Sequence, residues 1–163
     1  DIIARLRIFQ DAAGPSGNGV MIGNLTRLWL LTGADVYRQR AHNAVRAFSS
    51  QLDEYSLGMT AFLNNAEFFG RPLQIVIIGE EEAERTKALV RAVYSRAIPN
   101  KILTVLPPGQ EPPPDHLAAN RVKLEGQSSA YVCIDQTCSL PQTTAPGLRE
   151  ALDLASGPYP ETP

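Results

Sequence analysis

Two cysteines in the last third of the chain are spaced so that they could form a disulfide or a redox pair. Cys133 lies in an apolar run at residues 129–134, and Cys138 follows after four intervening residues. If Asp135 and Gln136 form a two-residue hairpin loop, Cys133 faces Cys138 in a non-hydrogen-bonded pair. The Cα atoms of such a pair are about 4.5 Å apart, which a disulfide tolerates. A redox pair or a structural bridge is therefore geometrically possible.

The same segment also fits a simpler interpretation, in which both thiols are reduced. Asp-Gln is a poor sequence for a tight hairpin turn, and Pro141 is expected to bend the second arm away. A Cys-x-x-Cys motif would be a stronger redox signal, and two cysteines alone do not complete a zinc site. We therefore predict two reduced, half-buried thiols at Cys133 and Cys138, with the disulfide as the alternative.

A second candidate is the loop at residues 11–18, which is rich in Gly, Pro, Ser and Asn. Such residues allow unusual backbone dihedrals. The side chains of Asp11, Ser16 and Asn18 could converge on a polar ligand such as a sugar, because loops on a rigid helical scaffold often carry binding groups. Alternatively, the side chains of Asp11 and Asn18 simply cap the helix that follows. The spacing alone favours neither interpretation.

The two histidines, His42 and His116, have no second histidine or cysteine nearby at the spacing of metal ligands. Neither belongs to a triad-like pattern. We predict that both lie on the surface, and we expect no metal and no cofactor. The strand that ends at Gly79 is followed by three glutamates, which would repel a phosphate, so a nucleotide site at this helix start is disfavoured.

The overall composition excludes several classes of partner. The net charge is −2 with the two signs interspersed, and no basic patch with interleaved aromatics is present, so we expect no nucleic-acid partner. The apolar runs are too short to span a bilayer, and no secretory signal is visible. Two cysteines in 163 residues do not form a secreted disulfide framework. These features favour a cytoplasmic protein without a membrane partner.

The first 70 residues predict helices joined by short loops. A strongly apolar helix at residues 20–32 stops at Gly33. An amphipathic helix follows at about residues 35–52, with Asp35 as its N-cap and one face in water. A third helix is expected at residues 56–69. Because a buried helix and an exposed one alternate, we expect stacked helical hairpins, as in a helical barrel.

The chain after residue 71 predicts a small α/β unit. The β-branched run at residues 73–78, bounded by Pro and Gly, indicates a buried strand. A helix at 81–97 and a strand at 101–106 complete a βαβ unit with parallel strands. The remaining expected elements are a helical turn at 115–119, strands at 121–124 and 129–134, and a last helix from Thr143 or Thr144 to about residue 155.

The predicted fold class is therefore α+β. Residues 1–70 are expected to form helical hairpins, residues 71–155 a small α/β domain, and residues 156–163 a loose tail.

Several motifs together resemble one family, the thioredoxin-domain-containing proteins related to the spermatogenesis-associated group. Its members carry a loop like Asp-Gly-Ala-x-Pro-Ser-Gly-Asn, a helix that closes with Leu-Thr-Gly, and a strand like Ile-Val-Ile-x-Gly. Near the end they have Tyr-Val-Cys, four residues, Cys and a turn rich in Pro and Thr. The matching segments here are 11–18, 24–28, 31–33, 75–79, 131–138 and 141–144. Ala12 departs from the pattern, because the family usually has Gly at this position.

This resemblance implies that the chain is the C-terminal part of a longer protein, and the chain begins at Asp1 without an initiator methionine. Such proteins have an N-terminal thioredoxin-like domain and a helical barrel, similar to the (α/α)6 barrels of N-acylglucosamine 2-epimerases and six-hairpin glycosidases. The three helices predicted in the first 70 residues would be the end of that barrel, with Asp11, Ser16 and Asn18 near its mouth. The implied partners are the rest of the full-length chain, a possible sugar ligand and a possible second copy.

Three functions follow from these observations. The full-length protein would be carbohydrate-active, like an isomerase or glycosidase. Alternatively, the Cys133 and Cys138 pair would make the chain a redox-linked module. The third possibility is a structural or interaction module. Since the chain contains no complete acid/base pair, triad or metal set, we expect no catalysis by these 163 residues alone.

Overall fold

The computed structural model of the chain describes residues 8–119, 121–124, 126–135 and 137–157. The chain divides into two compact units, Asp1–Arg71 and Pro72–Pro163. The first unit is helical, and the second combines helices with a four-stranded mixed sheet. The predicted α+β class is therefore confirmed.

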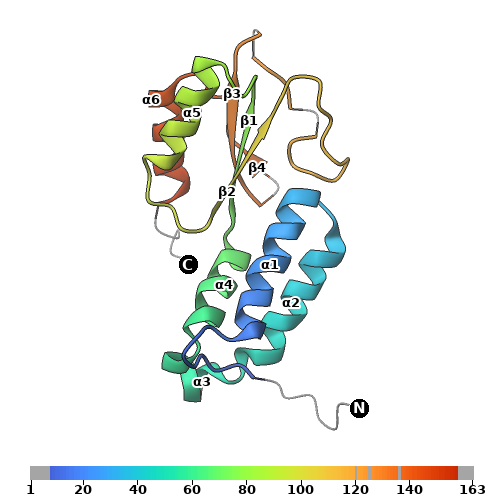
Figure 1. The fold of residues 1–163 in the computed structure, drawn as a ribbon, viewed down its shortest axis with the longest axis vertical. Coiled ribbons are helices and arrows are strands. Elements are labelled where there is room, and N and C mark those ends of the chain that lie inside the picture. The colour runs from blue at the N-terminus through green and yellow to red at the C-terminus, as the bar shows by residue number, and fades with distance from the viewer. Residues whose placement is uncertain (1–7, 120, 125, 136, 158–163) are drawn as a thin grey trace, which may run out of the picture. The chain divides into compact units, whose positions relative to one another are not determined.

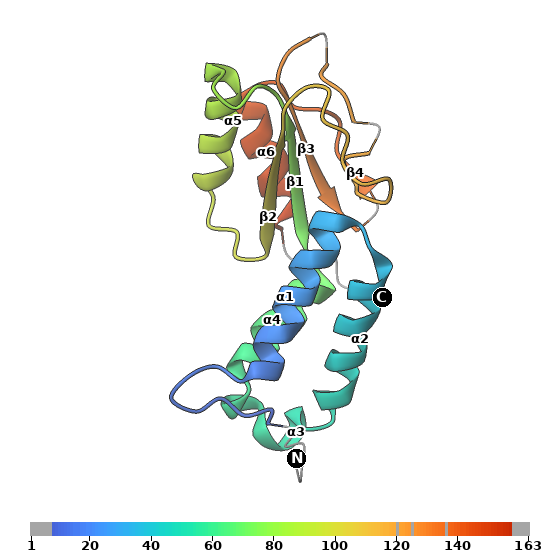
Figure 2. The ribbon, with the colours of Figure 1, turned by 45° about the vertical axis from the view of Figure 1, so that its right-hand side comes forward.

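The helical unit consists of three main helices that pack side by side (Figure 2). Its elements are α1 (Gly17–Thr32), α2 (Asp35–Ser49), α3 (Leu52–Tyr55), the 3-10 turn η1 (Ser56–Gly58) and α4 (Thr60–Gly70). α1 contacts both α2 and α4, so it is the central helix of this unit. Whether these helices belong to a barrel stays a prediction.

The start of α1 is set by a side-chain cap. The hydroxyl of Ser16 accepts a hydrogen bond from the Gly19 N–H group, which satisfies one of the unpaired donors of the first turn. For this reason α1 begins three residues earlier than the predicted Val20. Gly33 adopts a left-handed conformation with φ of 73° and ends the helix, as predicted.

The start of α2 differs from the prediction. Asp35 is the first residue of the helix, and Ala34 occupies the cap position without a side-chain hydrogen bond. The Asp35 carboxylate instead accepts a hydrogen bond of 2.6 Å from Arg38, one turn further along. The predicted solvent face of α2 is confirmed, since Arg38, His42 and Arg46 are exposed.

The prediction of a single helix at residues 56–69 is wrong, because the helical conformation is interrupted between η1 and α4. Met59 has a non-helical φ of −124°. The carbonyl of Gly58 accepts a hydrogen bond of 2.7 Å from the Asp11 N–H group rather than from the next helical turn. A contact that spans 47 positions of sequence therefore interrupts a pattern that looked continuous.

A glycine allows the close packing of α1 against α4. A Cβ atom placed on Gly19 would lie 2.7 Å from the backbone nitrogen of Phe62, closer than real Cβ contacts. The buried side chains around this contact come from all parts of the unit: Ile22, Phe48, Met59 and Phe62. The core of the helical unit thus depends on a small residue at the α1–α4 contact.

The α/β unit is built around one central strand (Figure 1). Its elements are β1 (Leu73–Ile78), α5 (Glu84–Tyr94), β2 (Lys101–Leu106), β3 (Ser129–Ile134), β4 (Thr137–Cys138) and α6 (Ala145–Ala155). The strand order is β2-β1-β3-β4. β1 pairs parallel with β2, which confirms the βαβ unit, and antiparallel with β3.

The strand predictions are confirmed at residues 73–78, 101–106 and 129–134. The helix predicted at 81–97 is shorter at both ends, because α5 begins at Glu84, after turns and a bend at residues 81–83, and ends at Tyr94. The last helix begins as predicted. The Thr144 hydroxyl accepts a hydrogen bond from the Gly147 N–H group, and Pro146 lies in the first turn, where its missing N–H group costs little.

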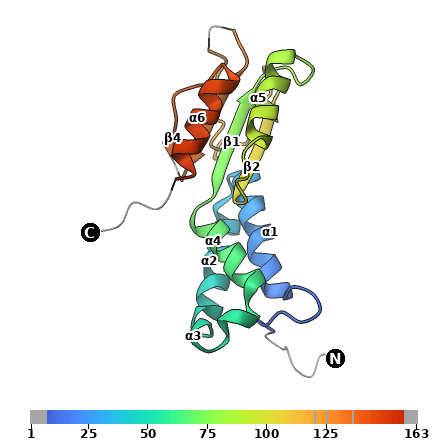
Figure 3. The ribbon, with the colours of Figure 1, turned by 90° about the vertical axis from the view of Figure 1, so that its left-hand side faces the viewer.

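The sheet has a separate core on each face. On one face Leu73, Ile75 and Ile77 pack against α5 and α6, which lie side by side in front of the strands (Figure 3). On the other face Val76 and Ile78 pack with Leu106, Ala118, Tyr131 and Cys133. β1 is buried along its whole length, as its unbroken run of apolar residues predicts for a central strand.

The two short elements predicted after residue 114 have different outcomes. At residues 115–119, where a short helical turn is predicted, the chain forms turns, and the Ala119 N–H group donates to the carbonyl of His116. In place of a strand at 121–124, the described residues contain an isolated bridge between Leu124 and Gln127. The predicted tail at 156–163 lies mostly outside the described residues, which end at Gly157.

Candidate functional site

Asp11 braces the 11–18 loop against the start of α4. Its Oδ1 atom accepts a hydrogen bond of 2.8 Å from the Ser16 N–H group, and its Oδ2 atom accepts one of 2.8 Å from the Ala61 N–H group. The backbone bonds from Ala61 and then Ser16 hold the pKa of the Asp11 carboxyl below its usual range. The carboxylate therefore acts as a cap for α4 and a clamp on the loop.

Ser16 and Asn18 lie at the junction between the loop and α1. Ser16 is buried and caps α1 through its hydroxyl. The Asn18 side-chain amide donates a hydrogen bond of 2.6 Å to the carbonyl of Ile8. This bond ties the chain before the loop to the first turn of the helix, so both ends of the loop are fixed.

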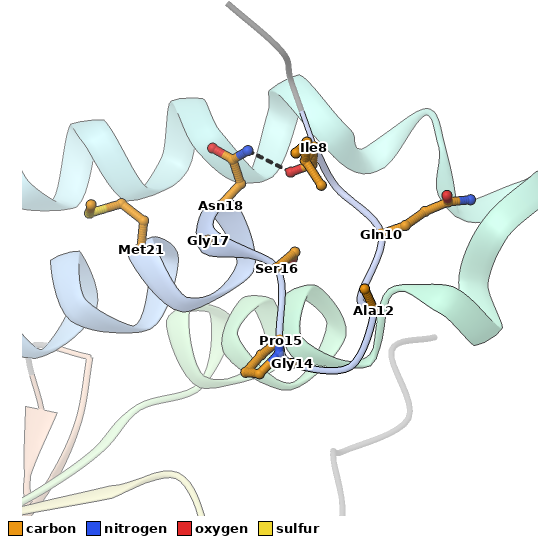
Figure 4. A pocket seen from close by; sticks show the side chains of 9 residues that line it. All are labelled: Ile8, Gln10, Ala12, Gly14, Pro15, Ser16, Gly17, Asn18 and Met21. Carbon is orange, nitrogen blue, oxygen red and sulfur yellow. Dashed lines mark hydrogen bonds between the residues drawn. The ribbon is translucent and has the colours of Figure 1, made fainter.

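The loop borders a hollow of about 560 Å³ (Figure 4). Its described lining comes from the loop, from the preceding chain and from the first turns of α1: Ile8, Gln10, Ala12, Gly14, Pro15, Ser16, Gly17, Asn18 and Met21. Ser16 and Asn18 are thus among the lining residues, whereas Asp11 braces the loop from outside that set. The volume is within the ~300–1,000 Å³ usual for ligand pockets.

The described lining of the hollow carries no ionisable side chain. It combines amide and hydroxyl groups from Gln10, Ser16 and Asn18 with apolar surface from Ile8 and Met21. Such a lining suits a neutral ligand that has both hydroxyl groups and an apolar face. In the described part of the chain, no group of three or more His, Cys, Asp or Glu side chains is placed to hold a metal ion.

The cysteine pair is oxidised, which corrects the prediction of two reduced thiols. Cys133 and Cys138 form a disulfide, with their Cα atoms 4.0 Å apart. The register that pairs them across β3 and β4 is the one predicted from the sequence. Asp135 adopts a positive φ of 52°, a conformation that Asp tolerates better than most residues, so the turn closes despite its unfavourable sequence.

His116 is buried rather than exposed, which corrects the second histidine prediction. Its Nδ1 atom accepts a hydrogen bond of 3.0 Å from the Ala118 N–H group, so the neutral ring carries its proton on Nε2. Nε2 lies 3.1 Å from the side-chain nitrogen of Gln74, which is also buried. Turning the Gln74 amide by half a rotation places its oxygen there as the acceptor of the ring proton.

The Gln74–His116 pair is the polar feature that the sequence reasoning missed. Gln74 lies within an otherwise apolar strand, and this single buried amide was a signal that a distant polar partner was required. His42 is placed as predicted, on the exposed face of α2, with its ring centroid 6.3 Å from that of Phe69. The two histidines therefore occupy opposite environments.

Among the described residues, no helix combines the length and the apolar character that crossing a membrane requires. No protein-family model matches the chain. No solved structure matches it either.

The geometry describes an α+β chain with a braced loop and hollow in one unit and a half-buried disulfide in the other. The chain is similar to a segment of larger curated proteins. It is 35% identical over 156 residues to spermatogenesis-associated protein 20 from Homo sapiens, a match that covers 91% of this chain and 19% of the relative.

Two further relatives carry the same name. The protein from Rattus norvegicus is 33% identical over 159 residues and the one from Mus musculus 31% over 160 residues. Each match covers 93% of this chain and 20% of the relative. The chain therefore spans about a fifth of the length of the curated relatives that it matches, and the similarity extends into both of its units.

Proposed function

We propose that this chain is the C-terminal part of a longer cytoplasmic protein that binds a sugar or related polyol, and that the hollow beside the 11–18 loop forms part of the binding site. The proposal extends to the architecture implied by the sequence resemblance: a thioredoxin-like domain followed by an epimerase-like or glycosidase-like helical barrel. In this view the helical unit closes the barrel.

One observation carries the ligand proposal: a hollow of about 560 Å³ with an uncharged described lining, at a loop held at both ends. Asp11 fixes the loop to α4, and Asn18 fixes the preceding chain to α1. A braced loop binds with little loss of conformational entropy, which favours affinity. The side-chain amides of Gln10 and Asn18 provide hydrogen bonds that sugar hydroxyls need, and Met21 offers an apolar surface.

The test is titration calorimetry of the intact longer protein against a panel of sugars and polyols. Asn18→Ala should weaken binding, because it removes an amide from the hollow. Asn64→Ala is the matched control, since Asn64 lies on an exposed position of α4 and outside the described lining. The proposal would be contradicted if no sugar of the panel gave a heat of binding. It would also be contradicted if both variants lost binding affinity equally.

A second candidate function, a redox-linked module, is favoured by the Cys133–Cys138 disulfide. In this proposal two glutathione thiols reduce the bridge, giving two protein thiols and one glutathione disulfide. Thiol titration across buffers from about −320 to about −180 mV covers the cellular range. A change of the cysteine pair from reduced to oxidised within this range supports the proposal. A pair that stays oxidised, or stays reduced, at every potential contradicts it and leaves a structural role for this unit.

A further inference from the structure

One side of α1 exposes large apolar side chains, although α1 is the central helix of its unit. Val20, Met21, Leu28 and Leu31 have 38%, 51%, 41% and 46% of their surface exposed. The opposite side of α1 is covered by α2 and α4, and Ile22 there is fully buried. The exposed residues are contiguous on the helix surface, since at 3.6 residues per turn the four positions fall within an arc of about 100°.

The exposed side of α1 has the spacing of a coiled-coil seam. Positions 17, 21, 24, 28 and 31 are separated by four, three, four and three residues, and all five are exposed. They are Gly17, Met21, Asn24, Leu28 and Leu31. This alternation is the a and d pattern by which one helix packs against another at a small crossing angle. We call these five residues the α1 seam.

We infer that the α1 seam is the docking surface for an amphipathic helix supplied by another part of the same longer protein. The inference rests on the first part of the proposed function, namely that this chain works within a longer protein. It does not depend on sugar binding. A polar residue at one core position of a seam fixes the register of the partner helix, and Asn24 has that place here.

The size of the seam favours a helix from the same chain over a second copy. The 16 residues of α1 rise about 24 Å, and a helix contact about 10 Å wide gives roughly 240 Å². A stable complex of two separate proteins needs about 800 Å² on each partner. A tethered helix is held at an effective concentration in the millimolar range, so a smaller contact suffices. The matched relatives contain such additional chain, because this chain covers 19–20% of their length.

The docked helix would also complete the hollow. Met21 belongs to the α1 seam and lines the hollow, and Asn18 projects from the same turn of α1 (Figure 4). A helix lying along the seam therefore forms a wall beside the 11–18 loop. The hollow would then be open in the 163-residue chain and enclosed in the longer protein.

The experiment compares the rate of maleimide labelling of Leu28→Cys in the 163-residue chain and in the longer protein. Both native cysteines are in the disulfide, so without reductant the new thiol is the target, and labelling is quantified on its own peptide by mass spectrometry. Labelling in the longer protein should be slower by about tenfold or more, because docked states typically open ~0.1–10% of the time. Leu57→Cys, whose parent side chain is 98% exposed, should label at equal rates in both.

Equal rates for Leu28→Cys in the two proteins would overturn the inference. Labelling that slows as the concentration of the 163-residue chain rises would assign the seam to a second copy and would also overturn it. Leu31→Cys is the second variant, measured the same way, in case Leu28→Cys fails to fold by circular dichroism. Protection of the seam without sugar binding would leave this inference standing and reject the ligand proposal, so the two failures are distinguishable.

Discussion

The central elements of the two units, β1 and α1, bury their apolar residues to very different extents. In the α/β unit, Ile75, Val76 and Ile77 of β1 are fully buried, with α5 and α6 on one face and the segment around Ala118 on the other. In the helical unit, α1 has a comparably apolar sequence but keeps one side in solvent. A fully covered strand derives most of its stability from its own unit, whereas a half-covered helix does not. The difference marks α1 as the less completely covered of the two central elements.

The largest effect is expected for Ile75→Ala in β1. Removing this side chain from a fully buried position leaves a cavity and should lower the free energy of unfolding by about 2–5 kcal/mol. Leu154→Ala is the control, because Leu154 is 79% exposed. Hydrogen exchange measured on peptides from β1 and α1 reports each unit separately. Equal acceleration in both peptides would show that the two units unfold as one and would remove the contrast drawn above.

The next effect tests the helical unit through Gly19→Ala. The added Cβ would lie 2.7 Å from the Phe62 backbone nitrogen, and backbone cannot move aside as a flexible side chain can. Overpacking should cost about 1–3 kcal/mol, more than the roughly 1 kcal/mol that Ala gains over Gly in a helix. Urea unfolding followed by the fluorescence of Trp29, the single tryptophan, reports this unit.

Gly17→Ala is the matched control for Gly19→Ala, because, apart from its chain neighbours and its own helical turn, no described residue lies within 4 Å of the added Cβ. This control should be neutral or slightly stabilising. If Gly19→Ala stabilises the protein as much as Gly17→Ala does, α1 and α4 do not approach as closely as described.

The strands were predictable because their signals are local. β1 is a β-branched run between Pro72 and Gly79, and its bounds follow from those residues alone. The hairpin register of the cysteines was predictable for the same reason. The oxidised state was not, because it depends on a left-handed Asp135 that the turn sequence disfavours.

The features that were predicted wrongly depend on contacts between residues far apart in sequence. The break before α4 follows from the hydrogen bond between Asp11 and Gly58, and the burial of His116 follows from Gln74, 42 positions away. The candidate site was half predictable: the sequence pointed to the 11–18 loop, but not to Asp11 as a brace. No periodicity within one segment carries such information.

A further prediction compares the two histidines. His116→Ala removes two hydrogen bonds from a buried site, those to Ala118 and Gln74, and should destabilise the α/β unit by about 1–3 kcal/mol. His42→Ala on the exposed face of α2 is the matched control and should change little. Hydrogen exchange of β1 and β3 peptides is the measurement. Similar exchange in the two variants would contradict the hydrogen-bond pairing of His116 with Gln74.

The smallest effect concerns Asp11 and depends on pH. The backbone hydrogen bonds to its carboxylate lower its pKa in the folded chain below the ordinary 3.8. The ionised form is therefore favoured by folding, and this stabilisation is present above the unfolded pKa and lost as the pH falls through the folded one. Asp11→Asn should unfold at lower urea than the wild type at pH 7, and the gap should close below about pH 4.

Trp29 fluorescence again reports the unfolding of the helical unit in this experiment. Asp53→Asn on α3 is the control for the loss of one negative charge, since Asp53 is an exposed aspartate of the same unit. Its difference from the wild type should be smaller than that of Asp11→Asn at pH 7. A gap for Asp11→Asn that is as wide at pH 3 as at pH 7 would mean that the side chain acts through packing alone. The braced loop would then lack a charge-dependent clamp.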